Sequence, residues 1–333
     1  MSNDPAPGPA DMPAGPWLTV LGMHRSGTSA LTGALGALGF GMPPQHDRVH
    51  WPESNPEHWE SSSLTVYDDD VLADLGGSWD APPDLVPGWE TSPAIRRVPH
   101  PSAVAARAFP VPGPIVWKDP RLCLLLPYWL RFLPHAPACV LIWRSPLGVA
   151  DSLRRRDGMA LADGVALWER YNRSALEHLV GLDTYVCSYE SLVADPAREL
   201  EALATWLHAL PRLADTSVHG DVGRAVESIV GLTPTGSDDD DGLLLAPQRA
   251  LGTVLADLQG GHRPLGPATL GAESPWTTAL LAARRGSRTR ELSGLESQIH
   301  QKQLAIDHLQ ASMSWRVTAP LRSVVAWARG RTR

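Results

Sequence analysis

The residues best suited to chemistry lie at positions 22–29, whose sequence is GMHRSGTS. Two glycines let the backbone turn tightly and approach a ligand closely, Arg25 adds a fixed positive charge, and Thr28 and Ser29 add hydroxyl donors. The segment follows an apolar run and precedes an Ala- and Leu-rich stretch. Between a strand and a helix, successive backbone N–H groups and the positive helix end converge on one anion. The segment therefore predicts a phosphate-binding loop, and a merely tight turn is the alternative.

This loop is not a Walker A motif, which requires a lysine directly after the second glycine. That position is Thr28 here. Hydrolysis of ATP or GTP is therefore disfavoured. A P-loop kinase or nucleotide hydrolase remains the main alternative, because it shares the strand–loop–helix geometry, and it would also need a carboxylate-held magnesium site.

A second anion site is predicted around Arg144, which follows an expected strand at 138–143. Ser145 and Pro146 form a helix start signal, with serine as N-cap and proline at the first helical position. Ser152 lies two turns into that helix, close to the face that Ser145 occupies. Open α/β sheets bind ligands at the carboxyl ends of their strands. Two anion sites at successive strand ends suit a nucleotide that is phosphorylated at two separated positions.

Together these segments resemble the sulfotransferases that use 3′-phosphoadenosine 5′-phosphosulfate, particularly their bacterial branch. Residues 22–29 are similar to that family's 5′-phosphosulfate loop, in the version with Arg in place of Lys. Arg144 and Ser152 match its 3′-phosphate pair, and residues 117–122 (WKDPRL) resemble its strand-end motif. The resemblance covers about residues 17–210. It implies a donor-binding set of His24, Arg25, Ser26, Gly27, Thr28, Ser29, Arg144 and Ser152.

The resemblance also implies a P-loop-like α/β fold, a three-layer sandwich around a central parallel sheet, and sulfuryl transfer with no required metal. Such a transfer needs a cation at the leaving oxygen and a base for the acceptor's proton. Lys118 is the candidate cation, since no other lysine occurs before residue 284; a lysine that only pairs with Asp119 is the alternative. Glu60 is the candidate base, because it matches the family's acidic motif. Glu57, His58 and Asp119 are its rivals.

The chain departs from the family's pattern in two places. No Gly-rich, Lys-containing segment near the C-terminus completes the 3′-phosphate site, as it does in cytosolic animal sulfotransferases, and Arg224 is a candidate substitute. The stretch 55–60 (NPEHWE) also lacks the glycine that is usual in the bacterial branch, which leaves the alignment of the acidic residue open.

The elements that must position these residues alternate along the chain. Apolar runs at 17–21, 115–117, 138–143 and 184–187 predict strands, and the stretches between them predict helices at 29–38, 121–132, 147–156, 161–180 and 196–209. Asp195 as N-cap and Pro196 at the first helical position mark the start of the last helix. Strands that alternate with helices imply right-handed crossovers and a parallel sheet covered on both faces.

Three regions stand apart from this pattern. Residues 1–16 are rich in Pro, Ala and Gly and are expected to form a disordered lead-in rather than a signal peptide. One α/β domain is expected to follow at 17–275. Residues 41–114 hold one predicted helix, at about 62–75, and are interpreted as a lid or acceptor-binding insertion. The insertion's tryptophans, Trp51, Trp59 and Trp79, either stack on adenine or a sugar ring or anchor the insertion to the core. His24 is expected to pack the loop.

The net charge of -7 argues against a general nucleic-acid binder, and it is unevenly divided. From Arg284 onward ten Lys and Arg oppose three Asp and Glu, a net +7, whereas the preceding residues carry 19 against 33, a net -14. No apolar run reaches the ~18 residues of a membrane span. The three cysteines are expected to be reduced, buried thiols, and the protein to be cytoplasmic.

The basic tail at 284–333 forms the third predicted region and carries a seam with alternating spacings of three and four. A coiled coil or a helix folded back on the body explains that seam equally well. Residues 315–327 place apolar side chains among arginines, which suits self-association or peripheral contact with the inner membrane face. A non-catalytic coiled-coil scaffold is therefore a further alternative. The seam consists of Leu292, Leu295, Ile299, Lys302, Ile306, Leu309 and Met313.

Residues 314–322 also resemble a tail found in some bacterial glycosyltransferases of surface-polysaccharide pathways. This resemblance favours a carbohydrate or a lipid-linked sugar as the acceptor of the sulfuryl group.

Overall fold

A computed structural model of the chain describes residues 12–13, 15–50, 59–95, 100–214, 220–229, 231–232 and 242–311. The chain divides into two compact units, Met1–Ala282 and Ala283–Arg333, and each is described by itself. The first unit holds the sheet and the predicted site residues, and the second continues the last helix.

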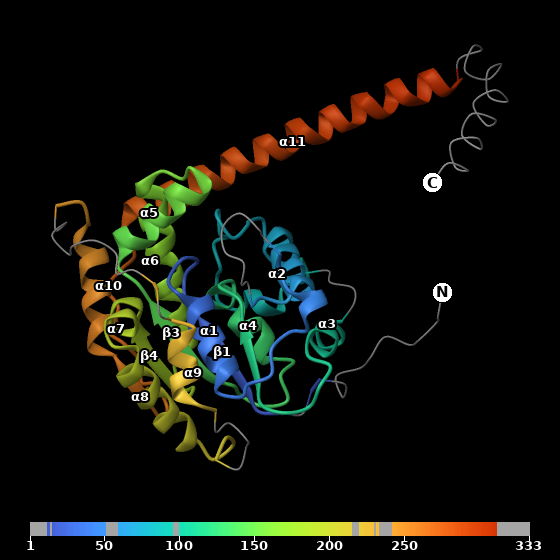
Figure 1. The fold of residues 1–333 in the computed structure, drawn as a ribbon. Coiled ribbons are helices and arrows are strands. Elements are labelled where there is room, and N and C mark those ends of the chain that lie inside the picture. The colour runs from blue at the N-terminus through green and yellow to red at the C-terminus, as the bar shows by residue number, and fades with distance from the viewer. Residues whose placement is uncertain are drawn as a thin grey trace. The chain divides into compact units, whose positions relative to one another are not determined.

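The first unit is an α/β fold whose helices surround a central sheet (Figure 1). The sheet has five strands in the order β2-β1-β3-β4-β5. Four strands are parallel, and β5 runs antiparallel beside β4. The α/β class and the central parallel strands predicted from the sequence are confirmed. The strands are β1 (Trp17–Leu21), β2 (Ile115–Lys118), β3 (Ala138–Trp143), β4 (Thr184–Ser188) and β5 (Gly260–His262).

Helices cover both faces of this sheet. Two buried clusters separate along β1: Trp17 and Leu21 belong to one cluster, and Leu18 and Val20 to the other. Because side chains alternate across a strand, these clusters lie on opposite faces, which makes the fold a three-layer sandwich. The helices are α1 (Thr28–Ala37), α2 (Ser62–Asp74), α3 (Pro101–Ala108), α4 (Leu122–Leu130), α5 (Pro146–Asp157), α6 (Leu161–His178), α7 (Tyr189–Ala194), α8 (Pro196–His208), α9 (Val222–Glu227), α10 (Ala246–Asp257) and α11 (Pro275–Ala311).

The structure holds elements that the sequence-based expectation lacks, namely the helices α3, α7, α9 and α10 and the strand β5. The insertion holds a second helix, α3, which begins with Pro101 at its first position and His100 as its cap. The sheet also gains β5, whose sequence Gly-Gly-His carries no apolar signal. A side chain at Gly261 would collide with Trp206, because an added Cβ would lie 2.1 Å from the indole. Close packing of α8 on the sheet edge explains Gly261, whereas Gly260 has a left-handed φ of 111° that favours glycine.

The three cysteines, Cys123, Cys139 and Cys187, are free and buried, as predicted. Burial raises the pKa of the Cys123 and Cys139 thiols to about 12, so both stay protonated at neutral pH. Both pack in the core, where Cys123 Sγ accepts a hydrogen bond from the Gly22 N–H and Cys139 Sγ accepts one from Thr19 Oγ1.

In the tail, α11 continues through Ala311 as one helix, on which Leu295 and Ile299 are exposed. Residues 315–327 and Met313 lie outside the described residues, so the choice between a coiled coil and a folded-back helix stays open. Among the helices of the described residues, none is both long and apolar enough to cross a membrane.

Candidate functional site

The loop between β1 and α1 has the strained backbone expected where a chain wraps closely around a ligand. Gly27 caps α1 with a left-handed φ of 91°. Among the described residues, Arg25 is the only non-glycine with a positive φ, at 72°. Such conformations persist only where the surroundings enforce them, and they concentrate at functional sites. The first N–H groups of α1 have no partner within the helix, so they are available to an anion.

Gly27 gives a direct test of this geometry. An added Cβ would lie 2.5 Å from the Tyr189 ring, in a conformation that already disfavours a side chain. Gly27→Ala is therefore expected to lower the free energy of unfolding by about 2 kcal/mol or more. It should also weaken pyrophosphate binding. The measurements are urea denaturation and titration calorimetry.

Gly76→Ala is the matched control. Gly76 also has a left-handed φ, of 82°, but an added Cβ there would meet nothing within 4 Å. Gly76→Ala should lower the free energy of unfolding only by the backbone strain, about 1 kcal/mol, and should leave pyrophosphate binding unchanged. Equal effects of the two substitutions would contradict a special role for the Gly27 contact.

The two predicted anion sites are joined in the structure. Arg25 Nε donates to Ser152 Oγ at 2.9 Å, and Arg144 Nη1 donates to the Arg25 carbonyl at 3.0 Å. The Arg144 guanidinium also lies over the Tyr189 ring, 4.3 Å from its centroid. The loop after β1 and the start of α5 therefore form one positively charged surface.

A third arginine, Arg156 on α5, adds to this charge and was not singled out from the sequence. Burial lowers the pKa of Arg25, and the positive charges of Arg156 and then Arg144 lower it further. Burial likewise lowers the pKa of Arg144. Three guanidinium groups held close together repel one another, and a bound anion would relieve that repulsion. The electrostatics therefore favour an anionic ligand.

Lys118 and Glu60 form an ion pair beside this surface. The ammonium of Lys118, at the carboxyl end of β2, contacts Glu60 Oε1 and also donates to Ser29 Oγ at 3.1 Å. Lys118 is 2% exposed and Glu60 is 8% exposed. The lysine therefore pairs with Glu60 rather than with Asp119. It connects the anion-binding loop to the one acidic candidate of the insertion that the structure describes.

Asp119, unlike its neighbour Lys118, forms hydrogen bonds that join α2 to the end of β2. Its Oδ1 accepts from the backbone N–H and from Nη1 of Arg121, and its Oδ2 accepts from Thr65 Oγ1 at 3.2 Å. Arg121 in turn makes a bidentate pair with Asp69, with bonds of 2.6 and 2.8 Å. These bonds fasten α2 to the end of β2. Because Glu60 immediately precedes the N-cap of α2, Ser61, they also hold Glu60 in place.

Among the rivals for the base, Glu57 and His58 lie outside the described residues, as does Trp51. Asp119 is buried, and burial raises its pKa even though Arg121 lowers it. Its bonds to Arg121 and Thr65 make it a positioning group. The choice of Glu60 stays a prediction, supported by its contact with Lys118.

The remaining aromatic candidates have anchoring contacts. The Arg48 guanidinium lies over Trp59, 4.6 Å from its ring centroid. Trp79 packs against His24, with ring centroids 4.5 Å apart. Burial and the nearby Arg121 hold the pKa of His24 well below its usual value, so its imidazole is neutral. The contact between His24 and Trp79 agrees with a packing role for the histidine and with a tryptophan that anchors the insertion, whereas the contact of Trp59 lies within the insertion.

One cleft of about 280 Å³ gathers most of the predicted residues. Ser26 and Ser152 are buried beside it, and Arg224 is exposed on α9 and does not line it. Tyr189, which the sequence reasoning missed, forms part of its wall. No group of three or more His, Cys, Asp or Glu among the described residues is arranged to hold a metal ion. The predicted residues that line the cleft are His24, Arg25, Gly27, Thr28, Ser29, Glu60, Lys118 and Arg144.

Comparisons with protein-family models and with curated proteins find no match. Among solved structures, the chain is similar to the sulfotransferase domain from the curacin biosynthetic pathway, with 13% identity and a TM-score of 0.37, over 81% of this chain and 98% of that one. It is also similar to the sulfotransferase domain from the Synechococcus PCC 7002 olefin synthase, with 17% identity and a TM-score of 0.35, over 82% and 95% of the two chains. Likenesses this distant do not establish an activity for this chain.

Proposed function

We propose that this chain is a sulfotransferase that moves a sulfuryl group from 3′-phosphoadenosine 5′-phosphosulfate to an acceptor hydroxyl. The observation that carries the proposal is the cleft itself. Its loop and the guanidinium groups of Arg25, Arg144 and Arg156 adjoin the buried pair of Lys118 and Glu60. An anion-binding surface with a cation and a carboxylate beside it supplies the parts that sulfuryl transfer requires.

The residues present fit such a donor. An added Cβ at Gly22 would lie 2.3 Å from the Ile142 carbonyl oxygen, so only glycine lets the loop start this close to β3. The loop N–H groups and Arg25 would hold the 5′-phosphosulfate, and Arg144 with Ser152 would hold the 3′-phosphate. The donor's negative charges would also offset the repulsion among the arginines.

In the proposed transfer, the acceptor oxygen forms a bond to sulfur while the bond from sulfur to the bridging phosphate oxygen breaks. Glu60 takes the proton of the acceptor hydroxyl. The ammonium of Lys118 neutralises the negative charge that develops on the leaving oxygen. Ser29, which accepts a hydrogen bond from Lys118, holds that ammonium against the loop.

The alternative of a P-loop kinase or nucleotide hydrolase receives less support. The position after Gly27 is Thr28, and the lysine in the cleft comes instead from β2. The carboxylate at the end of β2, which would be suited to magnesium, is engaged by Arg121 and Thr65. Because both oxygens of Asp119 accept these bonds, the carboxylate is not placed to hold a magnesium ion at a bound phosphate.

For the acceptor we propose a carbohydrate or lipid-linked sugar hydroxyl, on the strength of the tail resemblance in the sequence. Self-association or membrane contact through residues 284–333 is proposed from the seam, the net +7 charge and the apolar residues among arginines in the sequence. Neither proposal affects the chemistry assigned to the cleft.

The test is a transfer assay with isotopically labelled donor against a panel of glycans, phenols and lipids, read by mass spectrometry. Labelled sulfate should appear on an acceptor hydroxyl, and the activity should survive a metal chelator because Lys118 supplies the positive charge at the leaving oxygen. Loss of all activity with chelator, restored by magnesium, would favour the kinase alternative. Formation of phosphorylated product from ATP would reject the sulfotransferase assignment.

A further inference from the structure

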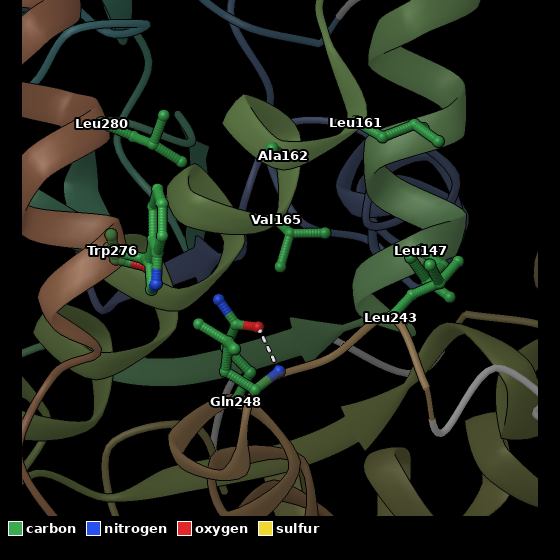
Figure 2. Close-up of a pocket in the computed structure, with 10 residues that line it drawn as sticks. Leu147, Leu161, Ala162, Val165, Leu243, Gln248, Trp276 and Leu280 are labelled. Carbon is green, nitrogen blue, oxygen red and sulfur yellow. Dashed lines mark hydrogen bonds between the residues drawn. The ribbon is translucent and has the colours of Figure 1, made fainter.

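A second cavity, of about 370 Å³, lies among α5, α6, α10 and the first turns of α11 (Figure 2). It belongs wholly to the first unit, and none of its lining residues lines the catalytic cleft. Its volume falls within the range of ~300–1,000 Å³ typical of small-molecule sites. The lining is apolar except for Gln248 and Thr277, and it comprises Leu147, Leu161, Ala162, Val165, Leu243, Leu245, Gln248, Trp276, Thr277 and Leu280.

Gln248 presents an oriented donor to this cavity. The side chain is 5% exposed, and its Oε1 accepts a hydrogen bond from the Leu245 N–H at 2.9 Å. Because that bond fixes which way the amide faces, Nε2 points toward the space between Trp276 and Val165 (Figure 2). No group in the described part of the chain accepts from Nε2. An oriented amide donor at the wall of an apolar cavity, with no protein acceptor among the described residues, is suited to a ligand oxygen.

The mouth of the cavity exposes more apolar surface than a solvated face needs. Leu243 and Trp276 are each 66% exposed, and Leu161 and Leu245 are 36% and 38% exposed. Thr277, by contrast, is turned inward and donates to Glu169 Oε2. Contiguous exposed apolar groups of this kind mark binding surfaces. A tryptophan at the rim suits a ligand that is apolar at one end and polar at the other.

We propose that this cavity binds a neutral amphiphile, with an alkyl chain among the apolar side chains and a carbonyl oxygen that accepts from Gln248 Nε2. Among the described residues, no Asp, Glu, Lys or Arg lines the cavity, so a charged head group finds no counter-ion in that part of the wall. A single fixed donor suits one carbonyl, as in an ester or amide, rather than the repeating donors and acceptors of a peptide strand. The site is independent of the chemistry proposed for the cleft.

The cavity and the cleft lie on different faces of α5. At 3.6 residues per turn, Leu147 projects from the side opposite Ser152 and Arg156. Leu147 lines the amphiphile cavity, Arg156 lines the cleft, and Ser152 bonds to Arg25. The ligand is therefore proposed as an occupant of a separate site rather than as the acceptor in the cleft.

The test is titration calorimetry of the full chain with 1-octanoylglycerol and 1-decanoylglycerol below their micelle concentrations. Saturable binding of one molecule is expected. The longer chain should bind roughly tenfold more tightly, because each buried methylene strengthens the association about fourfold at most. Gln248→Glu keeps an acceptor for the Leu245 N–H but removes the donor, so it should weaken binding of both probes.

Leu243→Asp provides a second variant that leaves the interior intact, since Leu243 is 66% exposed. It places a charge on the apolar wall and should also weaken binding. Val66→Asp is its matched control, because Val66 is 59% exposed on α2 and does not line the cavity. The proposal is overturned if the folded wild-type chain binds neither probe saturably. It is equally overturned if Gln248→Glu and Leu243→Asp bind the probes as the wild type does.

Discussion

Lys118→Met is expected to lower the kcat of sulfuryl transfer by roughly 100-fold or more, the loss usual when one preorganised charge donor is removed. Lys118 is the only lysine described in the first unit, and its ammonium bridges Ser29 and Glu60 at the end of the cleft. No neighbouring ammonium can replace it. Affinity for adenosine 3′,5′-bisphosphate should change little, because the donor's phosphates are assigned to the loop and to Arg144. Steady-state kinetics and calorimetry separate the two effects.

A fall in stability must be distinguished from a loss of chemistry, because Lys118→Met leaves the Glu60 carboxylate largely buried without its cation. The double variant Lys118→Met/Glu60→Gln removes both charges and should recover much of the thermal stability lost by the single variant. It should stay inactive. Glu60→Gln alone should retain nucleotide binding and lose most of its kcat, since the amide cannot take the acceptor's proton.

Retention of more than about a tenth of kcat by Lys118→Met would contradict the role of the ammonium at the leaving oxygen. Lys118→Arg is the conservative comparison. Its planar, wider head group cannot reproduce a compact contact with both Ser29 and Glu60, so only partial activity is expected. Full activity in Lys118→Arg would indicate that a diffuse positive charge is enough.

Much of the fold could be predicted because local signals and tertiary packing agree. The apolar run at 138–143 places β3 at its observed bounds, and the Ser145–Pro146 signal places the observed start of α5. β5 could not be predicted, since its Gly261 is explained by contact with Trp206, a residue distant in sequence. The helix α3 could not be predicted either, because its alanines form only a weak apolar pattern within a stretch rich in proline.

The candidate site was less predictable than the fold, because the sequence names residues but not their contacts. The loop after β1 and the pair Arg144 and Ser152 could be identified, yet the bond from Arg25 to Ser152 depends on the parallel pairing of β1 with β3. Arg156 could have been found, since it lies four residues after Ser152 and therefore on the same face of α5. Tyr189 offered no such signal.

Arg25→Ala is expected to weaken binding of adenosine 3′,5′-bisphosphate by roughly 30-fold, which corresponds to the ~2 kcal/mol of a hydrogen bond to a charged group. The unbound protein should lose little stability. Burial and the charges of Arg156 and Arg144 already disfavour the Arg25 guanidinium, so removing it relieves repulsion while it sacrifices one bond to Ser152. A side chain that is unfavourable in the free protein and favourable in the complex is typical of a ligand-binding group.

Arg144→Ala should weaken the same binding at least as much, because it removes a phosphate contact and also releases the Arg25 carbonyl. Arg154→Ala is the matched control for net charge: Arg154 lies on α5, its side chain is 58% exposed, and it pairs with Asp151 outside the cleft. At physiological salt its loss should alter affinity less than about twofold, since exposed charges are screened. Calorimetry with all three variants compares them directly. If Arg25→Ala and Arg144→Ala both bind the bisphosphate as tightly as Arg154→Ala does, the cleft is no nucleotide site, and the coiled-coil scaffold becomes the better explanation of the chain.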